Sequence, residues 1–310
     1  MGLALSARAR LRWAWDHDLA WSFRHSPVVM LAALLTIVCV GGAVLAPWIA
    51  PHSPFDSGTL ILTDGFTPPA WTAGGNGRYL LGTDDQGRDL LSTIMYGARI
   101  SLGVGIASVL FSMVLGVALG LVSGYGGGKI DAFIMRVADI QLSFPPILIA
   151  LLIDGVARVV LPREAHDQIA IYVLILAIGV SSWVQYARTV RGSTLVERSK
   201  EYVQAARVIG RGQASIMFRH VLPNVIGPVL VLATIHLATA IITEATLSFL
   251  GVGVPATQPS LGTLIRVGND FLLSGEWWIT VFPGLALIVL VLSVNLLGDW
   301  LRDALNPKLR

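Results

Sequence analysis

The chain has 310 residues, of which 54% are hydrophobic and only 13% are charged. A soluble globular protein carries about 25% charged residues, so this chain lacks the charge to cover a water-facing surface of its size. The apolar content excludes a disordered chain, and the single cysteine, Cys39, excludes a disulfide framework. The formal net charge of +3 is small, and we expect no nucleic-acid partner. Composition predicts an all-α integral membrane protein.

Six stretches are expected to cross the bilayer, in contact with membrane lipid. A hydrocarbon core of ~30 Å needs about 20 apolar residues in a helix, and most of the six stretches are free of charge over such a length. The third is weaker, because Pro145 and Pro146 interrupt it, but a neighbouring helix could satisfy the backbone groups that proline frees. The expected spans cover about 28–46, 100–124, 134–154, 168–187, 223–245 and 277–298.

The placement of lysine and arginine predicts which side each loop faces. Cytoplasmic loops are enriched in these residues, and an inside N-terminus puts most of the 22 in cytoplasmic segments. Both termini are therefore expected in the cytoplasm. Residues 1–26 mix tryptophans such as Trp13 and Trp15 with arginines, which is typical of an interfacial helix on the inner leaflet. Residues 27–301 form the expected permease domain, and 302–310 a cytoplasmic tail.

The cytoplasmic loop at 198–223 is the most informative segment. Glu201–Ile209 consists largely of good helix formers, and Gly210 suits the left-handed conformation that ends a helix. A second short helix is expected from Ser215, and Pro223 fits the opening turn of the fifth span.

The small residues Ala205 and Ala206 are expected to give this loop a flat face with a basic rim. Such a face permits close approach of another protein. We therefore expect a rigid elbow that docks on a partner.

Catalytic and metal-binding patterns are not found in the sequence. The segment Ser123–Ile130 lacks the first glycine and the final Ser or Thr of a phosphate-binding loop, so we expect no ATP hydrolysis by this chain. The six histidines are scattered singly, without metal-ligand spacing. We expect no catalytic residues, no metal site and no cofactor in this chain.

The cytoplasmic loop resembles the "EAA" loop of permease subunits of binding-protein-dependent ATP-binding cassette (ABC) importers. The matching positions are Ala205, Ala206, Gly210, Leu222 and Pro223, while Gln204 and His220 depart from the usual Glu and Ile.

Further stretches are similar to the C-type subunits of dipeptide and oligopeptide permeases. They comprise Leu81–Leu102 with its Gly-Thr-Asp-Asp-Gln-Gly-Arg-Asp run, Leu247–Gly251, and the tail from Asn295 to Pro307.

The resemblance implies the core of a type I ABC importer permease that moves dipeptides or short oligopeptides by alternating access. It implies a homologous second permease, two ATPase subunits that bind ATP and Mg²⁺, and an extracytoplasmic peptide-binding protein. Related subunits also serve nickel complexes and glutathione, so the substrate stays open. An alternative from the residues is an ion-coupled secondary transporter that works without an ATPase, with Asp154 and Glu244 as proton relays.

The resemblance assigns a role to the cytoplasmic loop, and the residues themselves suggest two further groups. The ATPase-coupling loop comprises Glu201, Tyr202, Gln204, Ala205, Ala206, Gly210, His220, Leu222 and Pro223. An outer group comprises Asp84, Asp85, Arg88 and Asp89. These residues could contact the binding protein that delivers the substrate. Alternatively, Thr83 or Asp84 could simply cap a helix.

Charged and titratable residues in the spans form the third group. Glu244 and His236 share the fifth span and are candidates for the translocation path, although Glu244 could instead lie at the membrane interface or pair with the second permease. Asp154 and Arg158 are spaced as an i, i+4 ion pair.

Overall fold

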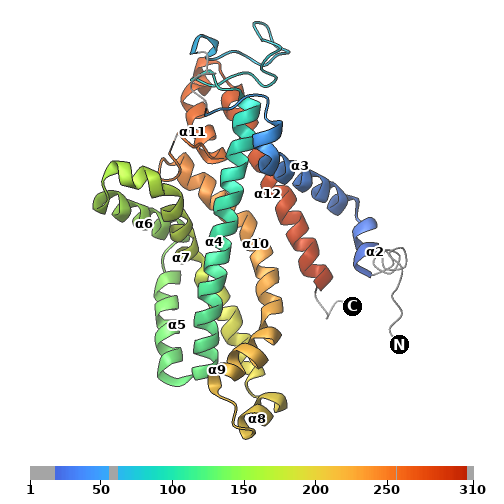
Figure 1. Cartoon of the computed structure of the whole chain (residues 1–310), viewed down its shortest axis with the longest axis vertical. Helices are drawn as coiled ribbons and strands as arrows, with labels where there is room; N and C mark the ends of the chain where they lie inside the picture. Colours follow the sequence, from blue (N-terminus) through green and yellow to red (C-terminus); the bar gives the residue numbers. More distant parts are fainter. Residues whose placement is uncertain (1–17, 56–61, 256, 306–310) are drawn as a thin grey trace.

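A computed structural model describes residues 18–55, 62–255 and 257–305, and in this part of the chain all regular secondary structure is helical. The predicted all-α class is confirmed. Helices α4, α5 and α10 stand roughly along one long axis, while α3 runs obliquely and α6 lies across it (Figure 1). Helices α8 and α9 lie at one end and α11 at the other. In chain order they are α2 (Asp18–Arg24), α3 (Pro27–Ile49), η1 (Leu62–Asp64), α4 (Leu90–Gly126), α5 (Gly128–Leu142), α6 (Pro146–Val160), α7 (Arg163–Glu197), α8 (Glu201–Val208), α9 (Gln213–Ile216), η2 (Met217–Val221), α10 (Leu222–Phe249), α11 (Leu261–Phe271), η3 (Leu272–Ser274) and α12 (Trp278–Leu305).

The centre of the bundle is the contact between α4 and α7. Three glycines four residues apart, Gly116, Gly120 and Gly124, face α7 so closely that a Cβ on any of them would lie 2.4–2.8 Å from an α7 atom. Spacing of small residues by four puts them on one helix face, which lets two membrane helices approach through their backbones.

The third span differs from the expected single helix. It consists of α5 and α6, which are bent by 93° at the break before Pro146. Pro145 disfavours a helical conformation of Phe144, and Pro146 suits the first turn of a helix, so the two prolines favour the end of α5 and the start of α6 at this point. Among the described residues, five other helices are long and apolar enough to cross a membrane, so the total is six if the bent pair is one span.

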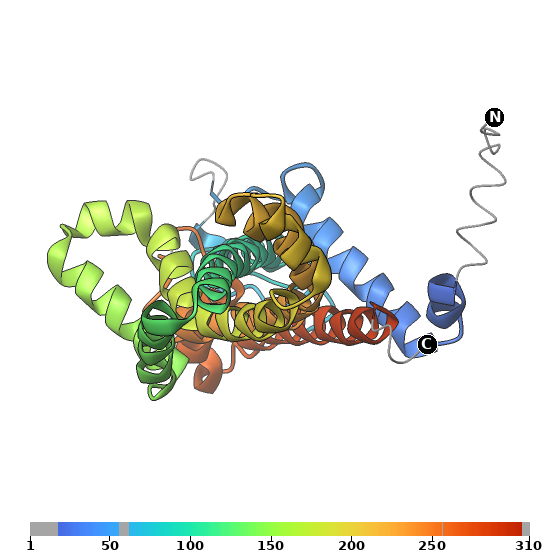
Figure 2. The same cartoon turned by 90° about the horizontal axis from the view of Figure 1, so that it is seen from below.

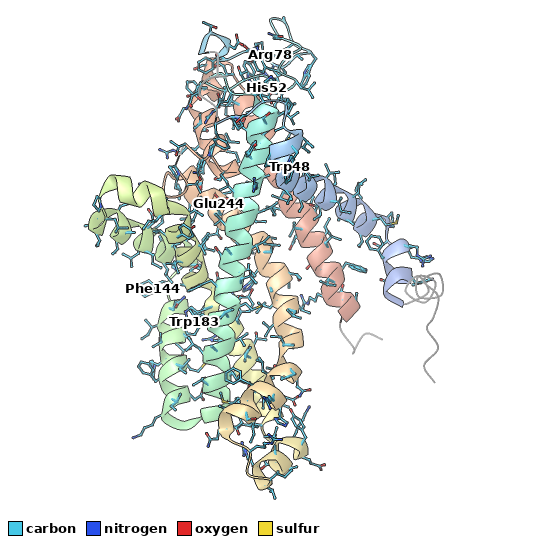
Figure 3. The ribbon with its side chains drawn as sticks, viewed as in Figure 1. Trp48, His52, Arg78, Phe144, Trp183 and Glu244 are labelled. Carbon is cyan, nitrogen blue, oxygen red and sulfur yellow. The ribbon has the colours of Figure 1, made fainter. Side chains whose placement is uncertain are left out.

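The outer end of the bundle is covered by the segment before α4. Thr83 and Asp89 form an antiparallel bridge, and the indole Nε1 of Trp278 donates to the Thr83 carbonyl oxygen at 3.1 Å. Figure 3 shows His52 and Arg78 in the same outer region, and Trp48 near the outer end of α3 with 77% of its surface exposed. An exposed tryptophan at this level suits the membrane interface.

The N-terminal helices lie at the side of the bundle, opposite α5 and α6 (Figure 2). Helix α2 is tied to α12: the Nε1 of Trp300 donates to Ser22 Oγ at 3.3 Å, and the ring of Phe23 meets the Trp300 ring edge-on. Of the interfacial helix predicted for residues 1–26, the structure describes only the part from Asp18 onward. Trp13 and Trp15 lie outside the described residues, as does the tail from residue 306.

Candidate functional site

The loop predicted to form the cytoplasmic elbow joins α7 to α10. Helix α8 ends at Gly210, whose φ of +80° is the left-handed conformation expected from the sequence. The Gly210 N–H donates to the Arg207 carbonyl oxygen at 2.9 Å, and the Arg211 N–H donates to the Ala206 carbonyl oxygen at 3.1 Å. These two bonds form the Schellman motif, which satisfies the last carbonyl groups of α8 and fixes the direction of the chain beyond it.

Tyr202 joins the two arms of the elbow. Its hydroxyl donates to Glu197 Oε2 at 2.7 Å and accepts from Asn224 Nδ2 at 3.2 Å. The same Asn224 amide donates to the His220 carbonyl oxygen at 2.6 Å. Burial, followed by the hydrogen bond to Glu197, raises the pKa of Tyr202 to about 12, so this hydroxyl remains a donor at neutral pH. The end of α7 and the start of α10 are thereby held by one side chain.

The elbow is also fastened to the inner end of α4. The Arg207 guanidinium lies over the Tyr125 ring, 5.3 Å from its centroid, and Arg198 Nη1 donates to the Gly124 carbonyl oxygen at 2.9 Å. Val203 and Ala206 are buried in an apolar cluster with residues of α9 and α10. A displacement of the elbow would therefore be transmitted to α4, α7 and α10 together.

The outward surface of the elbow differs from the expected alanine face. Ala206 points into the protein, and Ala205 is exposed. The reason is helix periodicity, because Val203 and Ala206 lie three residues apart on the buried face of α8. The exposed apolar surface lies at the tip, where Val208 is 88% and Ile209 78% exposed.

A π-helical segment separates α9 from α10. The Leu222 N–H donates to the Met217 carbonyl oxygen, five residues back, and Pro223 begins the α-helix that follows. Proline cannot donate a backbone hydrogen bond, so a change of helix type here avoids its clash with the preceding turn. His220 lies in this segment. The predicted role of Pro223 in the opening turn of the fifth span is confirmed.

The outer group of charged residues is mostly internal. Asp84, Arg88 and Asp89 are at most 4% exposed, and Arg88 Nε lies 2.6 Å from Asp84 Oδ2. The cap of α4 is Asp89, which accepts from the Ser92 N–H at 2.9 Å, so the expectation that Thr83 or Asp84 caps this helix is wrong. These three residues shape the turn and leave little surface for another protein.

Asp85 is the member of this group that reaches the surface, although only in part. Its Oδ1 is shielded from solvent and has no hydrogen-bond partner among the described residues. Burial, followed by the negative charge of Asp84, raises the pKa of the Asp85 carboxyl.

Glu244 is fully buried where α4, α10 and α11 meet (Figure 3). Ser248 Oγ donates to its Oε1 at 2.7 Å, and the hydroxyls of Ser101 and Ser260 also interact with the carboxyl group. Ser101 and Ser260 each accept a backbone N–H, from Leu261 and Thr263, and Glu244 Oε2 has no hydrogen-bond partner among the described residues. Neither reading of Glu244, as a path-facing or an interfacial group, fits this burial.

His236 lies closer to an exposed face. It is 8% exposed, and its Nε2 lies 2.7 Å from Oε1 of Gln185, an exposed residue of α7. The Tyr186 ring meets the His236 ring edge-on. Gln185 is therefore the residue presented at the surface, and His236 positions it from behind.

The predicted ion pair of α6 is confirmed. Arg158 Nε lies 2.5 Å from Asp154 Oδ2, and Arg158 Nη2 donates to the Gly251 carbonyl oxygen at 3.3 Å. Gly251 has a φ of +81° and contacts the Arg266 guanidinium on its other side. Asp154 is thus part of a structural link between α6 and the turn after α10, which does not favour a proton relay.

A metal-binding group of three or more His, Cys, Asp or Glu side chains is not found among the described residues. Two features stand out in the described residues: an elbow joined by hydrogen bonds to α7 and α10, and a bundle with closely packed helices. The four-residue spacing of Gly116, Gly120 and Gly124 is the sequence signal that could have predicted this close packing. The serines around Glu244 carried no comparable sign, because they come from separate segments.

Residues 116–310 match the family described as "Binding-protein-dependent transport system inner membrane component". The chain belongs to this family. It is a multi-pass inner-membrane permease component of an ABC importer, in which ATP hydrolysis is carried out by partner subunits and an extracytoplasmic binding protein delivers the substrate. This membership replaces the alternative of a secondary transporter that works without an ATPase.

Curated relatives cover nearly the whole chain. It is 38% identical to the di/tripeptide transport system permease protein DppC of Pseudomonas aeruginosa, over 93% of this chain and 91% of that protein. It is 40% identical to the dipeptide transport system permease protein DppC of Escherichia coli K12, over 93% and 91%. It is 35% identical to the oligopeptide transport system permease protein OppC of Bacillus subtilis, over 94% and 90%.

The fold resembles that of a solved importer. A chain of the MetNI methionine ABC transporter in an inward-facing conformation aligns with a TM-score of 0.54 and 20% sequence identity. The alignment covers 69% of this chain and 96% of that chain. At this identity the likeness supports the fold, and the predicted type of permease core is confirmed.

Proposed function

We propose that the importer containing this chain takes up dipeptides or short oligopeptides. The support is the set of relatives, which include permeases named for dipeptides, di/tripeptides and oligopeptides and align over at least 90% of both chains. In this proposal a homologous second permease completes the translocation path, two ATPase subunits sit on the cytoplasmic side, and a peptide-binding protein sits outside.

The elbow is proposed as the contact with one ATPase subunit. The observation that carries this assignment is its combination of a fastened base and an exposed apolar tip. Tyr202 and Arg207 attach it to α7, α10 and α4, while Val208 and Ile209 project from the protein. An apolar tip of this kind is costly to leave in water and suits a groove in a partner. Closure of the ATPases would then move the bundle as one body.

The translocation path is proposed to pass Gln185. An exposed amide in a membrane-spanning helix is costly against lipid, so such a residue faces water or protein. Thr239 and Thr243 lie on α10, on or next to the side of the helix that carries His236. The Thr239 hydroxyl donates to the His236 carbonyl oxygen, and the Thr243 hydroxyl donates to the Thr239 carbonyl oxygen. Their oxygens remain able to accept from a peptide N–H. Glu244 does not belong to this surface.

Outer docking of the binding protein is proposed on the surface around Asp85 and Gln86. These two residues are the parts of the Asp84–Asp89 turn that reach solvent, while their neighbours hold the turn in place.

The test uses the assembled importer in liposomes. Ile209→Asp places a charge at the elbow tip, where the native side chain is exposed and folding is unaffected. We expect loss of ATPase binding and of uptake of a radiolabelled dipeptide. Leu273→Asp is the matched control, since Leu273 is 100% exposed at the opposite end of the protein. Normal coupling in Ile209→Asp would contradict the elbow assignment. Uptake of a nickel chelate or glutathione in place of peptides would contradict the substrate assignment.

A further inference from the structure

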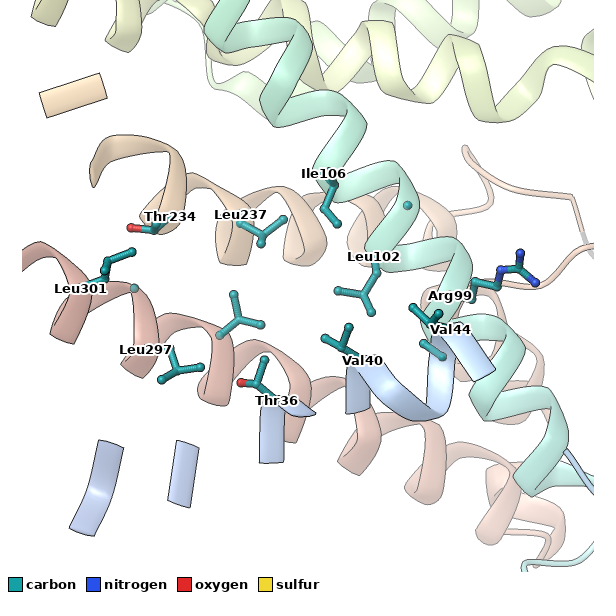
Figure 4. Close-up of a pocket in the computed structure, with 14 residues that line it drawn as sticks. Thr36, Val40, Val44, Arg99, Leu102, Ile106, Thr234, Leu237, Leu297 and Leu301 are labelled. Carbon is teal, nitrogen blue, oxygen red and sulfur yellow. The ribbon is translucent and has the colours of Figure 1, made fainter. Parts of the chain in front are cut away.

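An apolar cavity of about 480 Å³ lies among α3, α4, α10 and α12 (Figure 4). Each helix contributes residues at helical spacing, as α4 does with Leu102, Gly103 and Ile106. The cavity is nearly devoid of polar groups, and the Oγ1 of Thr36 in its wall has no hydrogen-bond partner among the described residues. A dry apolar space between membrane helices is suited to a hydrocarbon chain, because water there would lose its hydrogen bonds.

Arg99 stands at the outer end of this cavity. Figure 4 shows its side chain extending away from the apolar lining, with the guanidinium at the far end. The charge-free part of α4 begins at the next residue, Ile100, so Arg99 marks the level of the outer headgroups. Among the described residues no carboxylate forms an ion pair with Arg99.

A second cavity of about 500 Å³ adjoins the first at Arg99, which lines both. Its other walls include Tyr96, Thr257 and Gln258, so it offers a phenol, a hydroxyl and an amide beside the guanidinium. The two cavities form one amphipathic site: an apolar part within the bundle, a polar part at the outer surface, and an unpaired cation at their junction.

We infer that this site binds one phospholipid of the outer leaflet. The phosphate pairs with Arg99, the rest of the headgroup lies near Tyr96 and Gln258, and an acyl chain enters the apolar cavity. The distance from Arg99 to Ile106 along α4 is about 10 Å, which accommodates the upper half of a chain in one leaflet. Charge complementarity favours a lipid over an apolar protein segment, because the exposed Arg99 guanidinium at the headgroup level can pair with a phosphate and an apolar segment offers it no partner.

Such a lipid would fill the space between α3 and the other helices and so hold α3 in position. Only 17% of the α3 residues in its apolar window are buried in the protein, and α3 forms one wall of the cavity through Thr36, Val40 and Val44. Filling the space restores the packing that α3 lacks against α10. The proposal concerns this chain and its bilayer, and it does not depend on the identity of the transported substrate.

Native mass spectrometry of the full-length chain, delipidated and titrated with phosphatidylglycerol, tests the site. Wild type is expected to hold one tightly bound lipid, and diacylglycerol, which lacks the phosphate, to bind more weakly. Arg99→Gln should weaken phosphatidylglycerol binding about tenfold, since a hydrogen bond to a charged group is lost. Arg99→Lys should restore much of it.

A second variant fills the apolar part. Gly103 lines the cavity, and a Cβ there meets no atom within 4 Å, so Gly103→Leu should fill part of the cavity and abolish the tight site. Gly284→Leu is the control: it also meets nothing within 4 Å, but lies outside the cavity wall. Unchanged binding in Gly103→Leu, or an unchanged preference over diacylglycerol in Arg99→Gln, would overturn the proposal. Crosslinking of Gly103→Cys to the second permease in the assembled importer, with lipid excluded, would show a protein interface instead.

Discussion

Gly120 of α4 lies directly against the main chain of Ala187 in α7, so that a Cβ on Gly120 would fall 2.4 Å from the Ala187 carbonyl oxygen. The two helices thus touch through their backbones, and no side chain separates them. This contact joins the helix that begins at the outer cap to the helix that ends at the cytoplasmic elbow. A movement of the elbow that displaces α7 should therefore displace α4 as well.

Gly120→Ala is expected to destabilise the protein by about 1–3 kcal/mol, because the added methyl overlaps a backbone atom that cannot turn away. Thermal unfolding of the purified chain in detergent should show a lower midpoint. Gly103→Ala on the same helix is the control, since a Cβ there meets open space. Equal midpoints for the two variants would contradict the backbone contact.

Glu244 is expected to contribute to the stability of the folded protein. Glu244→Leu removes the acceptor of the Ser248 hydroxyl inside the protein and should cost about 1–3 kcal/mol, while Glu244→Gln keeps an acceptor and should cost less. Expression level and thermal midpoint measure the difference. Thr246→Val, which removes a hydroxyl bonded only within its own helix, serves as the control. Loss of uptake by a fully stable Glu244→Gln would instead favour a role in transport.

Tyr202→Phe should loosen the elbow and leave its apolar packing intact. It removes the donor to Glu197 and the acceptor for Asn224, so the arms of the elbow lose their shared bond. We expect the assembled importer to hydrolyse more ATP per peptide transported. Tyr172→Phe, at an exposed tyrosine of α7, should leave this ratio unchanged. An unaltered ratio in Tyr202→Phe would show that coupling does not require the bond.

Gln185→Leu is expected to reduce peptide uptake about tenfold, the loss that follows from one or two hydrogen bonds to a transported peptide. ATPase assembly should persist, because Gln185 lies outside the elbow. Uptake and copurification of the ATPases are measured on the same preparation. Full uptake by the variant would remove Gln185 from the path.

Asp85 should make stability depend on pH. Its pKa is raised above the ordinary 3.8 by burial and by Asp84, so the folded protein binds this proton more tightly than the unfolded chain does. Its contribution is fully present below pH 3.8 and is lost as pH rises through the higher folded value. In wild type this loss lowers the thermal midpoint as the pH rises through that range, and Asp85→Asn should make the decrease smaller. Asp270→Asn, at an exposed carboxyl on the outer side, is the control. An identical slope in Asp85→Asn and wild type would contradict the assignment.

Local features of the cytoplasmic elbow could be predicted from residues alone. Gly210 suits the positive φ that follows α8, and Pro223 suits the first turn of α10, so both positions follow from backbone chemistry. The burial of Ala206 could not be predicted in the same way. It depends on which face of α8 meets the apolar side chains of α9 and α10.

The sequence by itself determined the membrane class, the charge-free spans and the permease family, because apolar length, charge placement and motif spacing are properties of neighbouring residues. Only the tertiary structure decided that Asp84 and Arg88 are internal and that Glu244 is fully buried beside Ser248. Each of these depends on residues distant along the chain and on which side of a helix faces its neighbour. One-dimensional spacing does not specify those relationships until the helices pack.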